Sequence, residues 1–338
     1  MAETNRRVLL ASRPDGWVNA DNFTLDTQPI AAPGDGQVLC RNLFLSVDPY
    51  MRGRMNDVKS YVPPFQIGEP LAGGVVAEVI ESNAPGLAAG DHVVGMLGWE
   101  QYSVTDGAGL RKIVAGNHPL SYHLGILGMP GLTAYVGLMN VGECKAGDEV
   151  LVSAASGAVG SVVGQIARNT GCRVVGSAGS DEKVAWLKDS LGFDEAFNYK
   201  TVDSIHATVR AAFPKGIDVN FENVGGEILE AAIWNMALFG RIALCGMIAN
   251  YNDKPENMPA GPRGMTALIG RNVKMQGFIV SNYQQDAPKW DALARGWLDE
   301  SKLEYRETIA DGIDNAPSAF IGMLKGDNFG KQIVQIAG

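Results

Sequence analysis

The sequence has few cysteines and histidines, and neither type is spaced for a disulfide framework or a metal site. The four cysteines are widely separated and form no Cys-x-x-Cys pair: Cys40, Cys144, Cys172 and Cys245. A chain of 338 residues can bury a large core without cross-links, so we expect free thiols in a reducing compartment. The histidines lie far from the cysteines in sequence, which predicts that no metal is bound: they are His92, His118, His123 and His206.

The sequence also lacks long apolar runs and an excess of positive charge. No apolar run approaches the roughly 20 residues of a membrane span. Arg6 and Arg7 precede an apolar stretch that is too short for a signal-peptide core. Lys and Arg number 28 against 37 Asp and Glu, and this net charge of −9 disfavours binding to a phosphate backbone. We therefore expect a cytoplasmic protein with neither a membrane nor a nucleic acid as its partner.

Glycine is abundant, with 42 of 338 residues, or about 12% against a typical ~7%. The 16 prolines are an ordinary number, and no collagen-like period is present. The excess glycine therefore indicates tight turns and close backbone approaches rather than disorder. The length predicts about two domains.

The hydrophobic pattern changes along the chain. The first ~120 residues read as short strands separated by glycine turns, which is typical of a largely antiparallel β domain; the clearest strands span 37–47, 73–80 and 91–96. Beyond residue 123 strands and helices alternate, which predicts an α/β fold with a doubly wound parallel sheet. The predicted strands are 148–155, 172–178, 195–199, 217–222 and 240–245, and the helices are 159–170, 182–191, 205–213 and 228–237. The last ~50 residues predict a helix over 288–299, then strand, helix and a short strand over 332–336.

The turn Ala155-Ser156-Gly157-Ala158-Val159-Gly160 has the pattern of a dinucleotide-binding turn whose first glycine is replaced. Gly157 would let the backbone approach a pyrophosphate, and Gly160 would let the helix pack close to the strand. The helix N-terminus would direct its free N–H groups at the phosphates. The turn follows an apolar strand and opens a helix, which favours dinucleotide binding over an ordinary strand–helix turn.

The end of the next strand favours NADP over NAD. An NAD site would place an acidic residue about 20 residues beyond the turn, but Val175 and Ser177 stand there. Lys183 lies within one helical turn and Tyr199 ends the following strand, which suits a 2′-phosphate, although Lys183 could also be a solvated surface lysine. Asp181 could be the missing acid, but its place after Ser180 favours a helix cap.

Two candidate nucleophiles have simpler explanations. Cys245 ends a strand at the expected cofactor edge, where a small buried residue is favoured over a catalytic thiol. Ser156 lies in the phosphate turn, and no Gly-x-Ser-x-Gly elbow is present.

Taken together, these motifs resemble the zinc-independent branch of the medium-chain dehydrogenase/reductases. The chain is most similar to the NADPH-dependent alkenal double-bond reductases, which include leukotriene dehydrogenase/prostaglandin reductases and bacterial curcumin reductases. The matching segments run in the family's order: 47–55, 127–135, 155–160, 176–183, 221–226, 246–252 and 328–331. Zinc-dependent relatives carry Gly-His-Glu near where this chain has Gly68-Glu69-Pro70.

The resemblance implies a set of cofactor-binding residues. Gly157, Ala158, Val159 and Gly160 would hold the pyrophosphate, and Lys183 and Tyr199 would contact the 2′-phosphate. Asn223 would hydrogen-bond the cofactor, and Asn328 would close over it. The nicotinamide half would be lined by Cys245, Gly246, Ile248, Tyr251, Phe278, Ile279 and Val280. Ala249 stands where the family often has serine, so a hydroxyl next to Tyr251 is lost.

The resemblance also implies the architecture. Residues 1–125, completed by 288–338, would form a GroES-like β-rich catalytic domain, and residues 126–287 would form a Rossmann NADP-binding domain. The active site would lie in the cleft between them. Residues 272–280 read as an edge strand, which in relatives pairs with its twin and here predicts a homodimer.

The chemistry implied is conjugate reduction of a small-molecule enone or enal by NADPH. Tyr251 would donate a hydrogen bond or proton to the developing enolate, or would only form a wall of the pocket. Tyr50 and Arg52 would face the substrate, although Arg52 could equally be a structural ion-pair partner. Two alternatives stay open: a quinone reductase of the same superfamily, and a non-enzymatic NADPH-binding protein.

Overall fold

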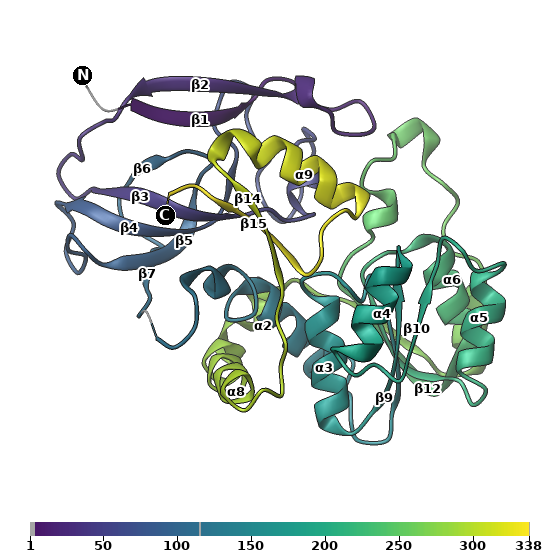
Figure 1. Cartoon of the computed structure of the whole chain (residues 1–338). Coiled ribbons are helices and arrows are strands. Elements are labelled where there is room, and N and C mark those ends of the chain that lie inside the picture. Colours follow the sequence, from purple (N-terminus) through teal and green to yellow (C-terminus); the bar gives the residue numbers. More distant parts are fainter. Residues whose placement is uncertain (1–3, 115, 338) are drawn as a thin grey trace. The chain divides into compact units, whose positions relative to one another are not determined.

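The computed structural model describes residues 4–114 and 116–337 and divides into two compact units (Figure 1). The first unit contains Met1–Gly125, Glu307–Asn328 and Gln332–Gly338. The second contains Ile126–Arg306 and Phe329–Lys331. Residues 288–306, which we expected in the β-rich domain, thus lie in the second unit.

The first unit is built on a seven-stranded sheet, in which β15, β3, β4, β5, β6 and β7 pair antiparallel. Its strand order is β14-β15-β3-β4-β5-β7, with β6 paired to β3, and β1 and β2 form a separate two-stranded sheet. The strands are β1 (Thr4–Leu10), β2 (Phe23–Pro29), β3 (Val38–Ser46), β4 (Ala72–Ser82), β5 (His92–Gly98), β6 (Tyr102–Thr105), β7 (Arg111–Lys112), β14 (Glu307–Asp311) and β15 (Lys331–Gln335). The helices are α1 (Met51–Arg54) and α9 (Ala316–Lys325), with short 3₁₀ turns at Ala20–Asn22, Leu120–Leu124 and Ile313–Asn315.

The second unit is built on a parallel six-stranded sheet, as the strand–helix alternation predicted. The order is β10-β9-β8-β11-β12-β13, so the chain winds outward in both directions from β8. The strands are β8 (Glu149–Val152), β9 (Arg173–Ala178), β10 (Glu195–Asn198), β11 (Ile217–Glu222), β12 (Met236–Leu244) and β13 (Lys274–Gly277).

The helices of the second unit follow the strands in sequence. They are α2 (Met129–Tyr135), continued by a π-helix at Val136–Val141, α3 (Gly160–Thr170), α4 (Asp181–Asp189), α5 (Ile205–Ala212), α6 (Gly226–Asn235), α7 (Met265–Gly270) and α8 (Ala287–Asp299). Short 3₁₀ segments lie at Ile248–Asn250, Pro255–Asn257 and Val280–Asp286. Within the described parts of the chain, no helix is long and apolar enough to cross a membrane.

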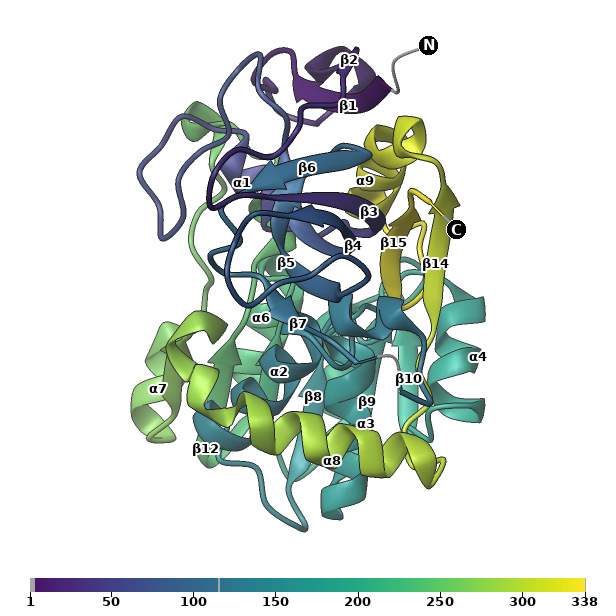
Figure 2. The same ribbon diagram turned by 90° about the vertical axis from the view of Figure 1, so that its left-hand side faces the viewer.

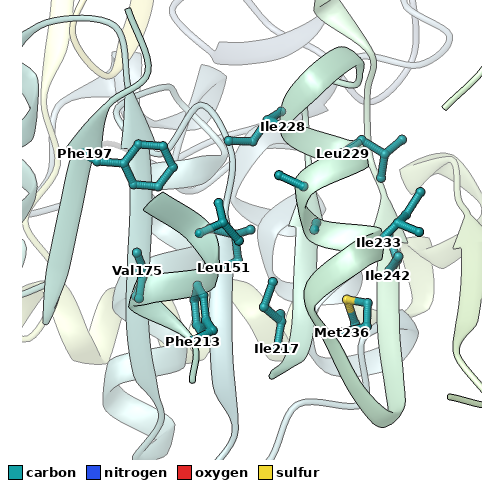
Figure 3. Close-up of a cluster of buried hydrophobic side chains, with 14 residues drawn as sticks. Leu151, Val175, Phe197, Phe213, Ile217, Ile228, Leu229, Ile233, Met236 and Ile242 are labelled. Atoms are coloured by element: carbon teal, nitrogen blue, oxygen red, sulfur yellow. The ribbon is translucent and has the colours of Figure 1, made fainter. Parts of the chain in front are cut away.

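A buried apolar cluster holds α5 and α6 against one face of the parallel sheet (Figure 3). Leu151 and Val175 are paired in register on β8 and β9, so their side chains point to the same face. They meet side chains of the two helices, including Val209, Ile228, Leu229 and Ile233. Burying each such side chain contributes about 1.5–3 kcal/mol relative to exposure, and this packing fixes the start of α6 beside the end of β11.

Glycines in α3 and β9 permit close packing around the start of the parallel sheet's first helix. A Cβ on Gly164 would lie only 1.9 Å from a ring carbon of Phe193, and one on Gly176 of β9 would lie 2.8 Å from the Cβ of Ala155. Glycine at both positions therefore lets the helix approach the sheet. At its other end α3 stops at Gly171, which has a φ of +91°.

Helix α8 belongs to the second unit because it packs on α2 (Figure 2). The Trp290 indole N–H donates a hydrogen bond of 2.7 Å to the Ile126 carbonyl, and its ring stacks on Tyr135 at 5.6 Å. Gly131 leaves room for that indole, since a Cβ there would lie 2.6 Å from Nε1. Because of these contacts, the second unit extends to residue 306 and does not end at the expected residue 287.

Candidate cofactor and active site

The turn between β8 and α3 has the geometry of a phosphate-binding site. The Gly157 N–H donates a 3.0 Å hydrogen bond to the carbonyl of Ala154, which has a φ of +47°. A Cβ on Gly160 would lie 2.4 Å from that carbonyl oxygen, so only glycine lets the helix begin here. No side chain caps α3, so the positive end of its dipole is left for an anion, although the N–H groups of Ser161 and Val162 already donate to the carbonyls of Gly157 and Val159.

A second segment, Phe329–Lys331, lies against this turn. The Gly330 N–H donates a 2.9 Å hydrogen bond to the Ser156 carbonyl, and Gly330 forms a bridge with Gly157. Gly330 has a φ of +58°, and a Cβ there would lie 2.0 Å from the Arg306 carbonyl oxygen. Asn328, which was expected to close over the cofactor, immediately precedes this segment but belongs to the first unit, so its role stays a prediction.

The two residues predicted at the 2′-phosphate both follow strands of the parallel sheet. Ser180 caps α4 by accepting a 3.3 Å hydrogen bond from the Lys183 N–H, and Lys183 is buried with its Nζ 5.2 Å from the Phe329 ring centroid. Tyr199 is exposed, and its hydroxyl lies 3.1 Å from where a Cβ on Gly179 would sit. Gly179 therefore lets the tyrosine approach the end of β9.

Asp181 faces a neighbouring strand. Its carboxylate accepts a 2.8 Å hydrogen bond from the Asn198 side chain at the end of β10, and it lies in the first turn of α4. A carboxylate in the first turn of a helix is stabilised by the helix dipole. This geometry favours a structural role for Asp181 over that of an acid that binds the ribose.

A buried carboxylate holds the carboxyl ends of β8 and β11 together. Glu222 accepts hydrogen bonds from the Ser153 hydroxyl (2.7 Å) and from the N–H groups of Val224 (2.7 Å) and Gly225 (2.9 Å). Burial raises the pKa of Glu222, and these hydrogen bonds oppose that shift. Sequence patterns did not predict this network, because apolar and polar residues alternate along β11 and the pattern does not single out Glu222.

Asn223, predicted to bind the cofactor, is fixed by the same network. Its side-chain amide donates a 2.7 Å hydrogen bond to the Ser153 carbonyl, and its backbone N–H donates a 2.7 Å bond to the Ser153 hydroxyl. The residue is thereby held at the edge of the sheet where the phosphate turn begins.

A pocket of about 490 Å³ brings together several residues predicted at the nicotinamide end. Its lining includes Cys245, Gly246, Tyr251, Phe278 and Ile279, with Leu244, Met247, Gly277 and Asn282. Ile248 lies in the adjacent 3₁₀ turn and Val280 follows Ile279, but neither is among these lining residues. The pocket lies beyond the carboxyl ends of β12 and β13, the usual ligand edge of a parallel sheet.

Gly246 lets the hydroxyl of Tyr251 approach the backbone. The hydroxyl oxygen lies 3.0 Å from where a Cβ on Gly246 would sit, and it accepts a long 3.4 Å hydrogen bond from the Met247 N–H. A tyrosine hydroxyl can both accept and donate hydrogen bonds. The arrangement therefore suits a hydrogen-bond donor in the pocket.

Cys245 is unsuited to act as a thiolate. Burial of its thiol raises the pKa to about 12, and the nearby Glu222 carboxylate adds to the shift. Because the thiolate is the reactive form, this geometry favours the interpretation of Cys245 as a small neutral lining residue.

The two substrate candidates of the first unit differ in their surroundings. Arg52 is buried and donates hydrogen bonds to the Gly16 carbonyl (2.7 Å) and to the Asn56 side chain (2.8 Å). These contacts favour a structural role for Arg52, holding the loop around α1. Tyr50 is half-buried beside Arg54, and burial raises the pKa of its hydroxyl, so it stays protonated.

No metal centre is evident in the residues that the structure describes. Among them, no three His, Cys, Asp or Glu side chains are grouped so that they could hold an ion. The four cysteines are free thiols.

Two family models match the chain and together cover most of it. One, described as the N-terminal domain of oxidoreductase, matches residues 6–113; the other, described as zinc-binding dehydrogenase, matches residues 158–295. With the phosphate turn and the parallel sheet, these matches define a medium-chain dehydrogenase/reductase.

Similar proteins narrow the class further. NADPH-dependent curcumin reductase of Escherichia coli is 44% identical, over 99% of this chain and 98% of the relative. The NADP⁺-dependent 2-alkenal reductase of Nicotiana tabacum is 45% identical over 100% and 99%, and prostaglandin reductase 1 of Rattus norvegicus is 48% identical over 95% and 96%. The chain belongs to the double-bond reductase branch of the medium-chain dehydrogenase/reductases.

A solved structure gives the same assignment. The crystal structure of CurA from Vibrio vulnificus in complex with NADPH has a TM-score of 0.92 and 43% sequence identity, and the match covers 98% of this chain and 99% of that one.

Proposed function

We propose that this protein reduces the carbon–carbon double bond of α,β-unsaturated ketones or aldehydes with NADPH, as a cytoplasmic enzyme. The observation that carries the proposal is near full-length similarity, at 44–48% identity, to three reductases named for curcumin, 2-alkenals and prostaglandins. The phosphate turn and the pocket around Tyr251 provide the groups that this reaction needs.

The residues present fit the cofactor. The uncapped α3 and the glycine-dependent turn at Gly157–Gly160 suit a pyrophosphate, and Lys183 and Tyr199 supply a cation and a hydroxyl for a 2′-phosphate. The nicotinamide half would be held by Asn223 and by residues 245–251 and 278–280, with Asn328 closing over it. NADPH supplies a hydride for the β-carbon of the substrate.

Tyr251 performs the second half of the chemistry. Negative charge develops on the carbonyl oxygen as the β-carbon gains a hydride, and the Tyr251 hydroxyl donates a hydrogen bond to that oxygen. A tyrosine hydroxyl can donate a hydrogen bond to an oxyanion. The α-carbon then takes a proton from the Tyr251 hydroxyl, which regains one from solvent, and the product is the saturated carbonyl compound.

The substrate class is tested by following NADPH oxidation with enals, enones and quinones under the same conditions. We expect turnover of enals and enones with saturated carbonyl products. Turnover of quinones with little turnover of enals would instead assign a quinone reductase. Cofactor binding without turnover of any acceptor would assign a non-enzymatic NADPH-binding protein.

The cofactor preference should depend on Lys183. We expect NADPH to be favoured over NADH by one to three orders of magnitude, and Lys183→Ala to lose roughly 1–3 kcal/mol of binding free energy with NADPH and little with NADH. Fluorescence titration of both cofactors measures the two losses. Equal losses would show that Lys183 does not contact the 2′-phosphate.

Metal removal should leave the activity unchanged. Because no metal-ligand set is grouped in the described residues, dialysis against a strong chelator should not alter the rate of enone reduction. Zinc-restorable loss of activity after dialysis would contradict this expectation.

A homodimer is the proposed assembly. Strand β13 is the last strand of the parallel sheet, as expected for residues 272–280, although the strand covers only Lys274–Gly277. Large apolar side chains on nearby elements are exposed and would be covered by a second copy, among them Leu238, Phe239 and Ile269. Light scattering should give twice the mass of the chain, and a monomer would refute the assembly.

A further inference from the structure

The guanidinium of Arg306 lies exposed on an aromatic platform next to the phosphate turn. Its Cζ is 4.2 Å from the ring centroid of Phe329 and 5.9 Å from that of Trp186. A cation held over a ring face loses little freedom on binding an anion, because the stack already restricts it. Arg306 forms no ion pair with any residue of the described chain.

The backbone around Arg306 ties this platform to the phosphate turn. The Arg306 carbonyl accepts a 3.0 Å hydrogen bond from the Lys331 N–H, and the Gly330 N–H donates to the Ser156 carbonyl. Gly330 lies so close to the Arg306 carbonyl that residue 330 cannot carry a side chain. These contacts therefore fix residues 306 and 329–331 in position relative to the turn that would bind the pyrophosphate.

Two further side chains, Gln165 and Trp186, fix the segment that precedes Arg306. Glu304 exchanges backbone hydrogen bonds with the Gln165 side chain of α3, at 2.7 and 2.9 Å. The Glu304 carboxylate accepts a 3.1 Å hydrogen bond from the Trp186 indole. That carboxylate is thus directed at Trp186 rather than paired with the guanidinium of Arg306.

A second cation shares the Phe329 ring. The Nζ of Lys183 lies 5.2 Å from the ring centroid, so both positive charges lie close to the same aromatic side chain. Like charges repel, and an anion that contacts both cations would relieve this repulsion. A 2′-phosphate carries two negative charges and several acceptor oxygens, and so fits two neighbouring donors better than one.

We propose that Arg306 is a second cation that selects the 2′-phosphate of NADPH, alongside Lys183. This inference rests on the proposed function, because it assumes that NADPH binds at the β8–α3 turn. Lys183 is buried, so its position is fixed by packing, whereas Arg306 is exposed and presents guanidinium donors to solvent. Arg306 is therefore a residue that determines specificity by binding the cofactor and takes no part in the chemical step.

The test compares binding of NADPH and NADH by the wild-type protein, Arg306→Gln and Arg306→Lys. We expect Arg306→Gln to weaken NADPH roughly 3–30-fold and NADH less than twofold, a smaller effect than for a buried contact because salt screens an exposed charge. Arg306→Lys should keep most of the NADPH affinity. The loss in Arg306→Gln should shrink as the salt concentration rises.

Arg295→Gln is the matched control, because Arg295 of α8 is also an arginine of this unit and is paired with Asp291 on its own helix. It removes the same charge and should leave the NADPH:NADH affinity ratio unchanged. Equal losses of both cofactors in Arg306→Gln would mean a merely structural role, and no loss at all would also overturn the inference. A wild-type protein with no preference for NADPH would instead refute the proposed cofactor.

Discussion

Replacing Tyr251 by phenylalanine should slow enone reduction about 10–100-fold in kcat while changing NADPH affinity by less than about threefold. Removing one donor from a water-free oxyanion site costs about 10²–10³ in rate. We expect a smaller loss because the pocket is open and water can partly replace the hydroxyl. The ring is retained in Tyr251→Phe, so the pocket wall is preserved and only the donor is lost.

Steady-state kinetics on a simple enone, beside a fluorescence titration of NADPH, separates the two quantities. A variant that turns over at the wild-type rate, with hydride transfer rate-limiting, would make Tyr251 only a wall of the pocket. Proton delivery would then come from water or from the cofactor ribose.

The second large effect is expected at Gly160, where alanine should weaken both the fold and cofactor binding. A Cβ at this position would lie 2.4 Å from the Ala154 carbonyl oxygen and 2.8 Å from the Cα of Ala155. Both are backbone atoms, which cannot rotate away as a flexible side chain could. The junction between β8 and α3 must therefore shift, at a cost of roughly 1–3 kcal/mol in the free energy of unfolding.

Because the shifted atoms would bind the pyrophosphate, we expect Gly160→Ala also to weaken NADPH at least about tenfold. Thermal denaturation and a cofactor titration measure the two effects. Gly296→Ala is a suitable control, since a Cβ there meets nothing within 4 Å and lies on α8. The free energy of unfolding of Gly296→Ala should rise by up to about 1 kcal/mol, because alanine favours the helix interior over glycine. Wild-type stability and affinity in Gly160→Ala would contradict the geometry of the turn.

The sequence predicted best what local patterns determine. The strand expected at residues 217–222 has those bounds in the structure, and the helix expected at 159–170 begins one residue later, at Gly160. Both follow from a hydrophobic period and a glycine turn, which a short window of residues contains. The phosphate turn was recognised for the same reason.

Other features depend on residues that lie far apart in sequence. From the sequence we expected the cofactor-binding domain to end at residue 287, but the second compact unit extends to Arg306. One reason is that the Trp290 indole bonds to the Ile126 carbonyl, 164 residues away in sequence. The short helix α2 is followed directly by a π-helix at Val136–Val141, and no local pattern distinguishes the two. The Glu222–Ser153 bond and the stack of Arg306 on Phe329 are equally long-range, and no local pattern indicates them.

The return of the chain at Phe329–Lys331 has a consequence for how the protein folds. The parallel sheet is formed by residues 149–277, but Gly330 must come back to Ser156 before the phosphate turn has its neighbouring segment. In the first unit β15 likewise pairs with β3, so Ile333 must reach Ser46. Closing such long loops costs entropy before any contact is gained, and pairings of this kind slow folding. We therefore expect the local strand–helix units to form first. The dinucleotide site would be completed later, when these distant segments pair.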